Sequence, residues 1–96
     1  MNKYEAFRVA ILEQARSVAE INHYISKTTW GLAHEYGIPE PHVREELLRL
    51  AKAGLIELWA DANPLFSGYF NIRLLSAGGE LLSKTTKSPI GFAASR

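Results

Sequence analysis

The side chains in this sequence that could carry out acid–base or metal chemistry are its three histidines and a pair of neighbouring glutamates. His23, His34 and His42 do not have metal-ligand spacing with one another or with carboxylates on a single face. Glu45 and Glu46 diverge by about 100° on a helix, so they cannot form a paired-carboxylate site. The absence of cysteine excludes thiol catalysis and thiolate zinc sites. We therefore expect no enzyme activity, no metal site and no cofactor.

The remaining charged residues of interest lie in a helix that the sequence predicts from Glu40 to Ala53. Pro39 and Pro41 bracket its start, where a fixed φ is tolerated because the first N–H groups have no intrahelical partner. Gly54 ends it. At about 100° per residue, the core-facing side consists of Val43, Leu47, Leu50 and Ala51. The opposite side consists of His42, Glu45, Arg49 and Lys52, and between the two lie Arg44 and Leu48.

Length and composition limit the kinds of protein that this chain can be. Its 96 residues make one domain at most, and 47% hydrophobic with 22% charged residues is typical of a soluble globular protein. No run approaches the ~20 apolar residues of a membrane-spanning helix, and the first residues lack the apolar region of a signal peptide. A cysteine-free chain of this kind fits the cytoplasm. The net charge of +1 is low for a dedicated nucleic-acid binder.

A first helix is predicted from residue 3 to residue 20. Its inward stripe is formed by Tyr4, Phe7, Ile11, Ala15 and Val18. Val9 and Leu12 lie off that stripe. They are either isolated surface residues or a patch for another subunit, and the sequence leaves both open.

A second helix is predicted between this first helix and the one that starts at Glu40. The hydroxyl of Thr28 or Thr29 caps it, and Gly37 ends it because glycine can take a positive φ. The side chains expected to face inward are Leu32, Ala33 and Tyr36, and those expected to face water are His34 and Glu35. We expect Trp30, in the first turn, to pack on the first helix, and the alternative is that it lies against a DNA backbone.

Two antiparallel strands are predicted at residues 55–60 and 69–74, from apolar alternation with period two. Their aliphatic face consists of Ile56, Leu58, Phe70, Ile72 and Leu74, and should cover the helices. On the outer face, Trp59 and Tyr69 are candidates for a cross-strand aromatic pair. The connector 61–68 is rich in turn formers. A last helix over 76–84 is expected to be short or irregular because Gly78 and Gly79 weaken it.

Several of these positions together carry a family resemblance. They are Leu32-Ala33, Gly37-Ile38, the Val43, Leu47 and Leu50 face, the Gly54-Leu55-Ile56 exit, and the run 75–82, which is similar to an "LT-x-x-G-x-x-L" pattern. The sequence resembles the winged-helix superfamily, of the kind represented by MarR-like and PadR-like bacterial regulators. The resemblance implies an α+β, mostly α fold over residues 1–84. This fold is a three-helix bundle with a helix-turn-helix, a two- to three-stranded antiparallel β-wing and a short C-terminal helix.

One further element is implied by the resemblance, and one further expectation comes from the composition of the tail. A minimal first strand is expected near Tyr24 and Ile25. The tail 85–96 is expected to be mobile, or to dock on a partner through Ile90 and Phe92.

The resemblance implies a sequence-specific, DNA-binding transcriptional regulator that acts as a homodimer. In that superfamily the third helix lies in the major groove of double-stranded DNA. The positions of this chain that correspond to the DNA-reading residues of that helix are Pro41, His42, Arg44, Glu45 and Arg49. At the start of the second helix, Lys27, Thr28 and Thr29 are expected to contact the DNA backbone.

This chain departs from the family pattern in its charges. Glu40, Glu45 and Glu46 offset the cations of the third helix, so that this region has no net positive charge. The wing has no Lys or Arg between Glu57 and Arg73, and its apolar residues include Leu65 and Phe66.

Two alternatives follow from these departures. One is a winged-helix protein–protein interaction module in a larger DNA-transaction or phage-type assembly, with a protein partner at the wing, the first helix or the C-terminal tail. The other is a ligand- or pH-responsive regulator with an effector pocket between subunits, for which the sequence offers no pocket residues.

Overall fold

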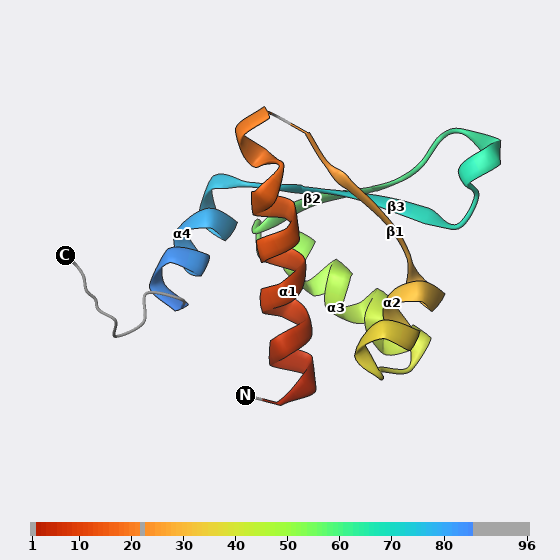
Figure 1. The fold of residues 1–96 in the computed structure, drawn as a ribbon, viewed down its shortest axis with the longest axis horizontal. Coiled ribbons are helices and arrows are strands. Elements are labelled where there is room, and N and C mark those ends of the chain that lie inside the picture. The colour runs from red at the N-terminus through yellow and green to blue at the C-terminus, as the bar shows by residue number, and fades with distance from the viewer. Residues whose placement is uncertain (1, 22, 86–96) are drawn as a thin grey trace.

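The computed structural model describes residues 2–21 and 23–85, which form a mostly helical α+β structure (Figure 1). Most of the predicted tail, from residue 86 onward, lies outside the described residues. The elements, in chain order, are α1 (Lys3–Ser17), a 3-10 turn (Ala19–Ile21), β1 (Ile25–Thr28), α2 (Thr29–Tyr36), α3 (Glu40–Lys52), β2 (Ile56–Ala60), a 3-10 turn (Pro64–Phe66), β3 (Tyr69–Leu74) and α4 (Ser76–Thr85).

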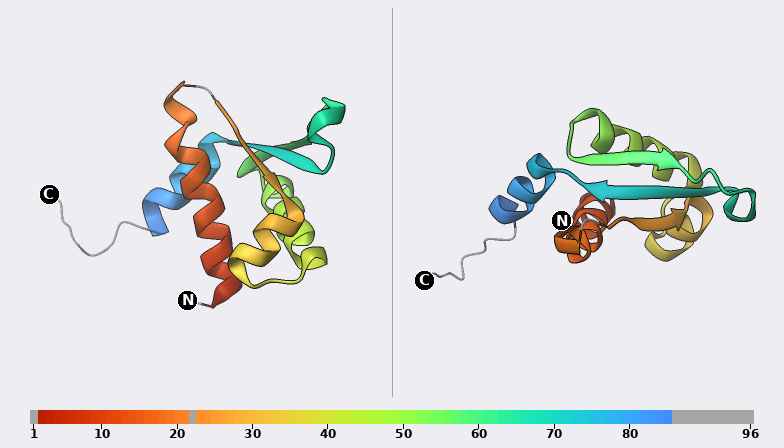
Figure 2. Two further views of the ribbon diagram at one scale, coloured as in Figure 1. Left: turned by 45° about the vertical axis from the view of Figure 1, so that its right-hand side comes forward. Right: turned by 90° about the horizontal axis from the view of Figure 1, so that it is seen from above.

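The three strands form one antiparallel sheet in the order β1-β3-β2. Ile72 of β3 lies opposite Ile25 of β1 and Leu58 of β2, so one row of aliphatic side chains crosses the sheet. α2 and α3 lie beneath the sheet in Figure 1, and Figure 2 shows the three strands side by side from above. The predicted strands 55–60 and 69–74 and the aliphatic face of the sheet are confirmed to within one residue. The first strand begins at Ile25 and extends three residues beyond the predicted Tyr24–Ile25 position.

The hydrophobic core lies between α1, α3 and the sheet, and α4 closes one side of it. Its buried members are Phe7, Ile11, Leu12, Ala15, Leu32, Ile38, Val43, Leu47, Leu50, Ile56, Ile72 and Leu82. The prediction for Leu12 is wrong, because its side chain is only 3% exposed. The reason is α4, which packs against α1 and widens the buried stripe of that helix beyond one-third of its circumference. Val9 also packs against the core.

The ends of the helices follow their local sequence signals. The Oγ of Thr28 accepts a hydrogen bond from the Gly31 N–H (3.1 Å) and caps α2. Gly37 ends that helix at φ 65° and Gly54 follows α3 at φ 76°, the left-handed region that favours glycine. α1 ends at Ser17, three residues earlier than predicted, and a 3-10 turn follows it.

Two aromatic predictions are wrong. Trp30 is 68% exposed, because the inward positions in the first turns of α2 belong to Thr29 and Leu32. Trp59 does not pair with Tyr69, because the strand register sets it opposite Asn71. Its aromatic partner is Tyr24, at a centroid distance of 5.1 Å.

α4 is a ten-residue helix, longer and more regular than its two glycines predict. Gly78 is buried, and a Cβ built there would lie 2.3 Å from the carbonyl oxygen of Leu55. In the same corner, the Leu75 N–H donates to that oxygen at 3.0 Å. The glycine therefore permits a close backbone approach, which offsets its low helical propensity.

We expect Gly78→Ala to lower the free energy of unfolding by about 1–3 kcal/mol, because the new methyl group must push α4 away from Leu55. Gly79→Ala is the matched control, since its Cβ would meet nothing closer than 3.7 Å. That control should be neutral or stabilising by up to about 1 kcal/mol. Urea unfolding followed by circular dichroism measures both variants, and equal effects would contradict the close approach.

Tyr36 joins α2 to α1 in a partly buried contact. Its ring lies edge-on to Phe7 (5.4 Å, 80°), and its hydroxyl accepts a hydrogen bond from Nε2 of Gln14 at 2.9 Å. Burial, and secondarily the negative charge of Glu35, raise the pKa of the Tyr36 phenol above its ordinary value of 10.0. The folded protein therefore holds this proton more tightly than the unfolded chain does.

A raised phenol pKa contributes stability that is fully present below the unfolded-state pKa and is lost as the pH rises through the folded-state pKa. We therefore expect the free energy of unfolding to fall more steeply in the wild type than in Tyr36→Phe as the pH rises above the ordinary phenol pKa of 10.0. Urea titrations at a series of pH values test this expectation. Parallel pH profiles for the two proteins would contradict it.

Candidate functional site

The solvent-facing side of α3 carries most of the residues singled out by the sequence. Val43, Leu47 and Leu50 anchor the helix in the core. Their spacing directs a second set of side chains toward solvent. The exposed residues of α3 include Pro41, His42, Arg44, Glu45, Leu48, Arg49 and Lys52. The predicted division of this helix into two faces is confirmed.

Glu46 does not lie on the solvent-facing side of α3. It is 6% exposed, and its Oε1 accepts a hydrogen bond from Nη1 of Arg8 on α1. Its other oxygen lies 3.5 Å from Nη1 of Arg49, which is itself exposed. Arg8 therefore offsets the negative charge of Glu46 inside the α1–α3 junction. Of the three carboxylates that offset the α3 cations in the sequence, Glu40 and Glu45 are exposed, whereas Glu46 is buried between Arg8 and Arg49.

The first turn of α3 is tied to its neighbours. The hydroxyl of Tyr4 and Nδ1 of His42 form a 2.8 Å hydrogen bond. Oε2 of Glu40 accepts a hydrogen bond from the Thr29 hydroxyl at 2.6 Å. Thr29 is 4% exposed, and its hydroxyl is used in this contact inside the protein.

Lys27 and Thr28 lie on β1 rather than on α2, with Thr28 also serving as the α2 cap. Lys27 is opposite Phe70 in the sheet register. Cζ of Arg44 lies 6.0 Å from the centroid of the same Phe70 ring. Phe70 thus brings a residue of β1 and a residue of α3 to one place, which the linear sequence does not reveal.

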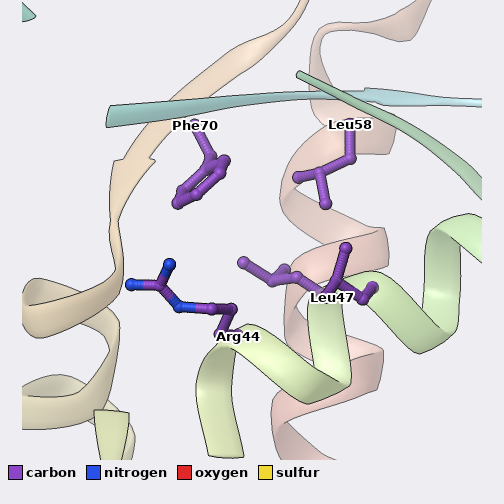
Figure 3. A pocket seen from close by; sticks show the side chains of 5 residues that line it. Arg44, Leu47, Leu58 and Phe70 are labelled. Atoms are coloured by element: carbon purple, nitrogen blue, oxygen red, sulfur yellow. The ribbon is translucent and has the colours of Figure 1, made fainter. Parts of the chain in front are cut away.

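A pocket of about 160 Å³ opens between α3 and the strands β2 and β3. Phe70 and Leu58 point from the strands toward Arg44 and Leu47 on the helix (Figure 3). Leu48 completes the lining and is 51% exposed. The pocket is apolar apart from the Arg44 guanidinium. One feature of the sequence pointed to this pocket, because Arg44 and Leu48 were predicted to lie between the core and solvent faces of α3.

The connector between β2 and β3 presents apolar side chains to solvent. Leu65 is 87% exposed, and Phe66 beside it is also exposed. A 3-10 turn, capped by the side chain of Asn63, holds both residues. The connector therefore offers an anionic group, Asp61, and apolar groups, but no cation.

Within the described residues there is no group of three His, Cys, Asp or Glu side chains that could hold a metal ion. No helix in this part of the chain is long and apolar enough to cross a membrane. Comparison with known proteins found no matching family model, no matching curated protein and no matching solved structure.

We expect Arg8→Ala to lower the free energy of unfolding by about 1–3 kcal/mol, because it leaves the buried Glu46 carboxylate without its nearest donor. The double variant Arg8→Met/Glu46→Leu removes both charges. It should recover most of the lost free energy of unfolding, since a buried ion pair can often be replaced by apolar packing. Arg16→Ala, an exposed arginine of the same helix, is the control and should stay within about 0.5 kcal/mol of wild type. Thermal and urea unfolding measure all three. If Arg8→Ala is as stable as the wild type, the Arg8–Glu46 pair contributes nothing to the free energy of unfolding.

Proposed function

We propose that this chain is a winged-helix domain and that it acts as a homodimeric, sequence-specific DNA-binding transcriptional regulator. The order α1-β1-α2-α3-β2-β3 and the strand order β1-β3-β2 fit such a domain. In this reading, α2 and α3 form the helix-turn-helix, the connector 61–68 is the tip of the wing, and α3 enters the major groove. The proposal includes a cytoplasmic location and no enzymatic activity.

The observation that carries the proposal is the inward turn of Glu46. Arg8 pairs with this carboxylate, which also lies 3.5 Å from Arg49, and the exposed side of α3 carries Arg44, Arg49 and Lys52 with Glu45 as the exposed carboxylate among them. Cations on an exposed helix can replace counterions along the phosphate backbone, which supplies most of the non-specific affinity for DNA. The low net charge of the chain matters less when its cations gather on one helix.

Each exposed residue has a definite role in this proposal. Arg44 and Arg49 contact phosphates or a guanine edge, and Glu45 accepts from cytosine N4. Pro41 and His42 lie at the groove floor near the start of the helix. Lys27 contacts the backbone from β1. In a dimer, two α3 helices about 34 Å apart would read the two halves of a palindromic site.

A second candidate function is a protein–protein interaction module in a larger DNA-transaction or phage-type assembly. The observation that favours it is the apolar character of the same region. The pocket beside Arg44, the half-exposed Leu48 and the exposed Leu65 suit a protein surface better than a phosphate backbone. The two candidates differ in their response to salt.

We expect the protein to bind random-sequence duplex DNA at about 50 mM salt and to lose most of that affinity by about 200 mM, because counterion release is the main driving force. Arg44→Ala/Arg49→Ala should reduce the slope of log affinity against log salt by about 2, since each lost phosphate contact contributes about 0.9. Fluorescence anisotropy with a labelled duplex measures the affinity, and sedimentation at several concentrations measures the dimer.

The charge-matched control is Arg16→Ala/Lys84→Ala, which removes two exposed cations from α1 and α4. It should keep the wild-type slope. If the protein does not bind DNA near 50 mM salt, the DNA proposal is contradicted and the protein–protein interaction module becomes the favoured function. Equal losses in the two double variants would mean that DNA responds to total charge and not to α3.

A further inference from the structure

A second hollow lies on the sheet face opposite the helices, at the base of the connector 61–68. Its volume is about 270 Å³, and its lining consists of His23, Tyr24, Ser26, Asp61, Phe66 and Tyr69. Tyr69 is opposite Thr28 in the register, and Asn71 is opposite Ser26, so alternation along β3 directs these side chains away from the buried Ile72. None of the lining residues belongs to α3.

Aromatic rings form most of the wall of this hollow. Phe66 and Tyr69 stand perpendicular to each other, with centroids 5.7 Å apart and an interplanar angle of 89°. Tyr24 contacts His23 on one side (5.0 Å) and Trp59 on the other (5.1 Å). The faces of such rings carry partial negative charge and attract cations.

The hollow also contains a carboxylate that the fold holds in place. Oδ2 of Asp61 accepts a hydrogen bond from Nδ2 of Asn71 (3.1 Å), and Oδ1 accepts from the Asn63 N–H (2.9 Å). Asn71 is itself buried, and its Oδ1 accepts from the Ser26 hydroxyl at 2.6 Å. Among the described residues, no Lys, Arg or His forms an ion pair with Asp61. The hydrogen bonds therefore fix the carboxylate in position, and no ion pair within the described part of the chain neutralises it.

We propose that this hollow binds a small organic cation with an alkylated ammonium head, of the choline type. Rings from two sides and one fixed carboxylate form the arrangement that recognises quaternary ammonium groups, whose methyl-covered charge needs no hydrogen-bond donors or acceptors in return. A bare metal ion would need several oxygen or nitrogen ligands, and the described residues bring no such group together. This site is separate from the proposed DNA-binding surface and does not depend on it.

The test is a titration of the full chain with choline, followed by ¹H–¹⁵N NMR in the absence of DNA. The matched ligand control is 3,3-dimethylbutanol, which has the same shape as choline but a carbon in place of the charged nitrogen. We expect choline to shift the backbone resonance of Tyr69 and the side-chain amide of Asn71. The neutral alcohol should bind at least about tenfold more weakly, because it lacks the charge that the rings and Asp61 recognise.

Phe66→Leu should weaken choline binding by about two- to fivefold, since it removes one ring face. The neighbouring Leu65→Ala is the control and should leave binding unchanged, because Leu65 lies outside the hollow. Both positions are exposed, so neither change threatens the fold. Asp61→Asn should weaken binding further than Phe66→Leu. Equal binding of choline and the neutral alcohol, or an unchanged affinity in Phe66→Leu, would overturn the proposal.

Discussion

The contact between Arg8 and Glu46 is the constraint on which the candidate surface depends. A carboxylate in the middle of α3 is costly to bury without a partner, and Arg8 supplies one from α1. Val43, Leu47 and Leu50 set the rotation of α3 about its own axis, and Arg8 allows Glu46 to be buried against α1 at that rotation. That rotation exposes Arg44, Arg49 and Lys52 together. Arg8 contacts no DNA in our proposal. It nevertheless influences the charge of the α3 surface that does, because it pairs with Glu46.

Much of the fold could be predicted from local signals. Gly37 and Gly54 end helices because the backbone there takes a positive φ, and Thr28 caps α2 through its own hydroxyl. Strands β2 and β3 follow from apolar alternation. These features depend on residues close together in the chain, where periodicity and turn chemistry apply directly.

The features that the sequence did not predict share a different cause, which is contact between residues far apart in the chain. Leu12 is buried by α4, Glu46 is matched by Arg8, and Trp59 meets Tyr24 across the sheet. Each depends on a partner more than thirty residues away in the chain, which periodicity cannot identify. For the same reason, the sequence predicted the outward residues of α3 but not the pocket beside Arg44, which needs Phe70 from β3.

The close approach of Gly78 to Leu55 has a mechanical consequence. Only Leu75 separates β3 from α4, and its N–H bonds to the Leu55 carbonyl just after α3 ends. The last helix is therefore joined to the central strand by one residue and to the segment after α3 by a backbone hydrogen bond. A displacement of α4, for example by a fused domain, would therefore act directly on β3 and on the Leu55 backbone, because no longer linker lies between them.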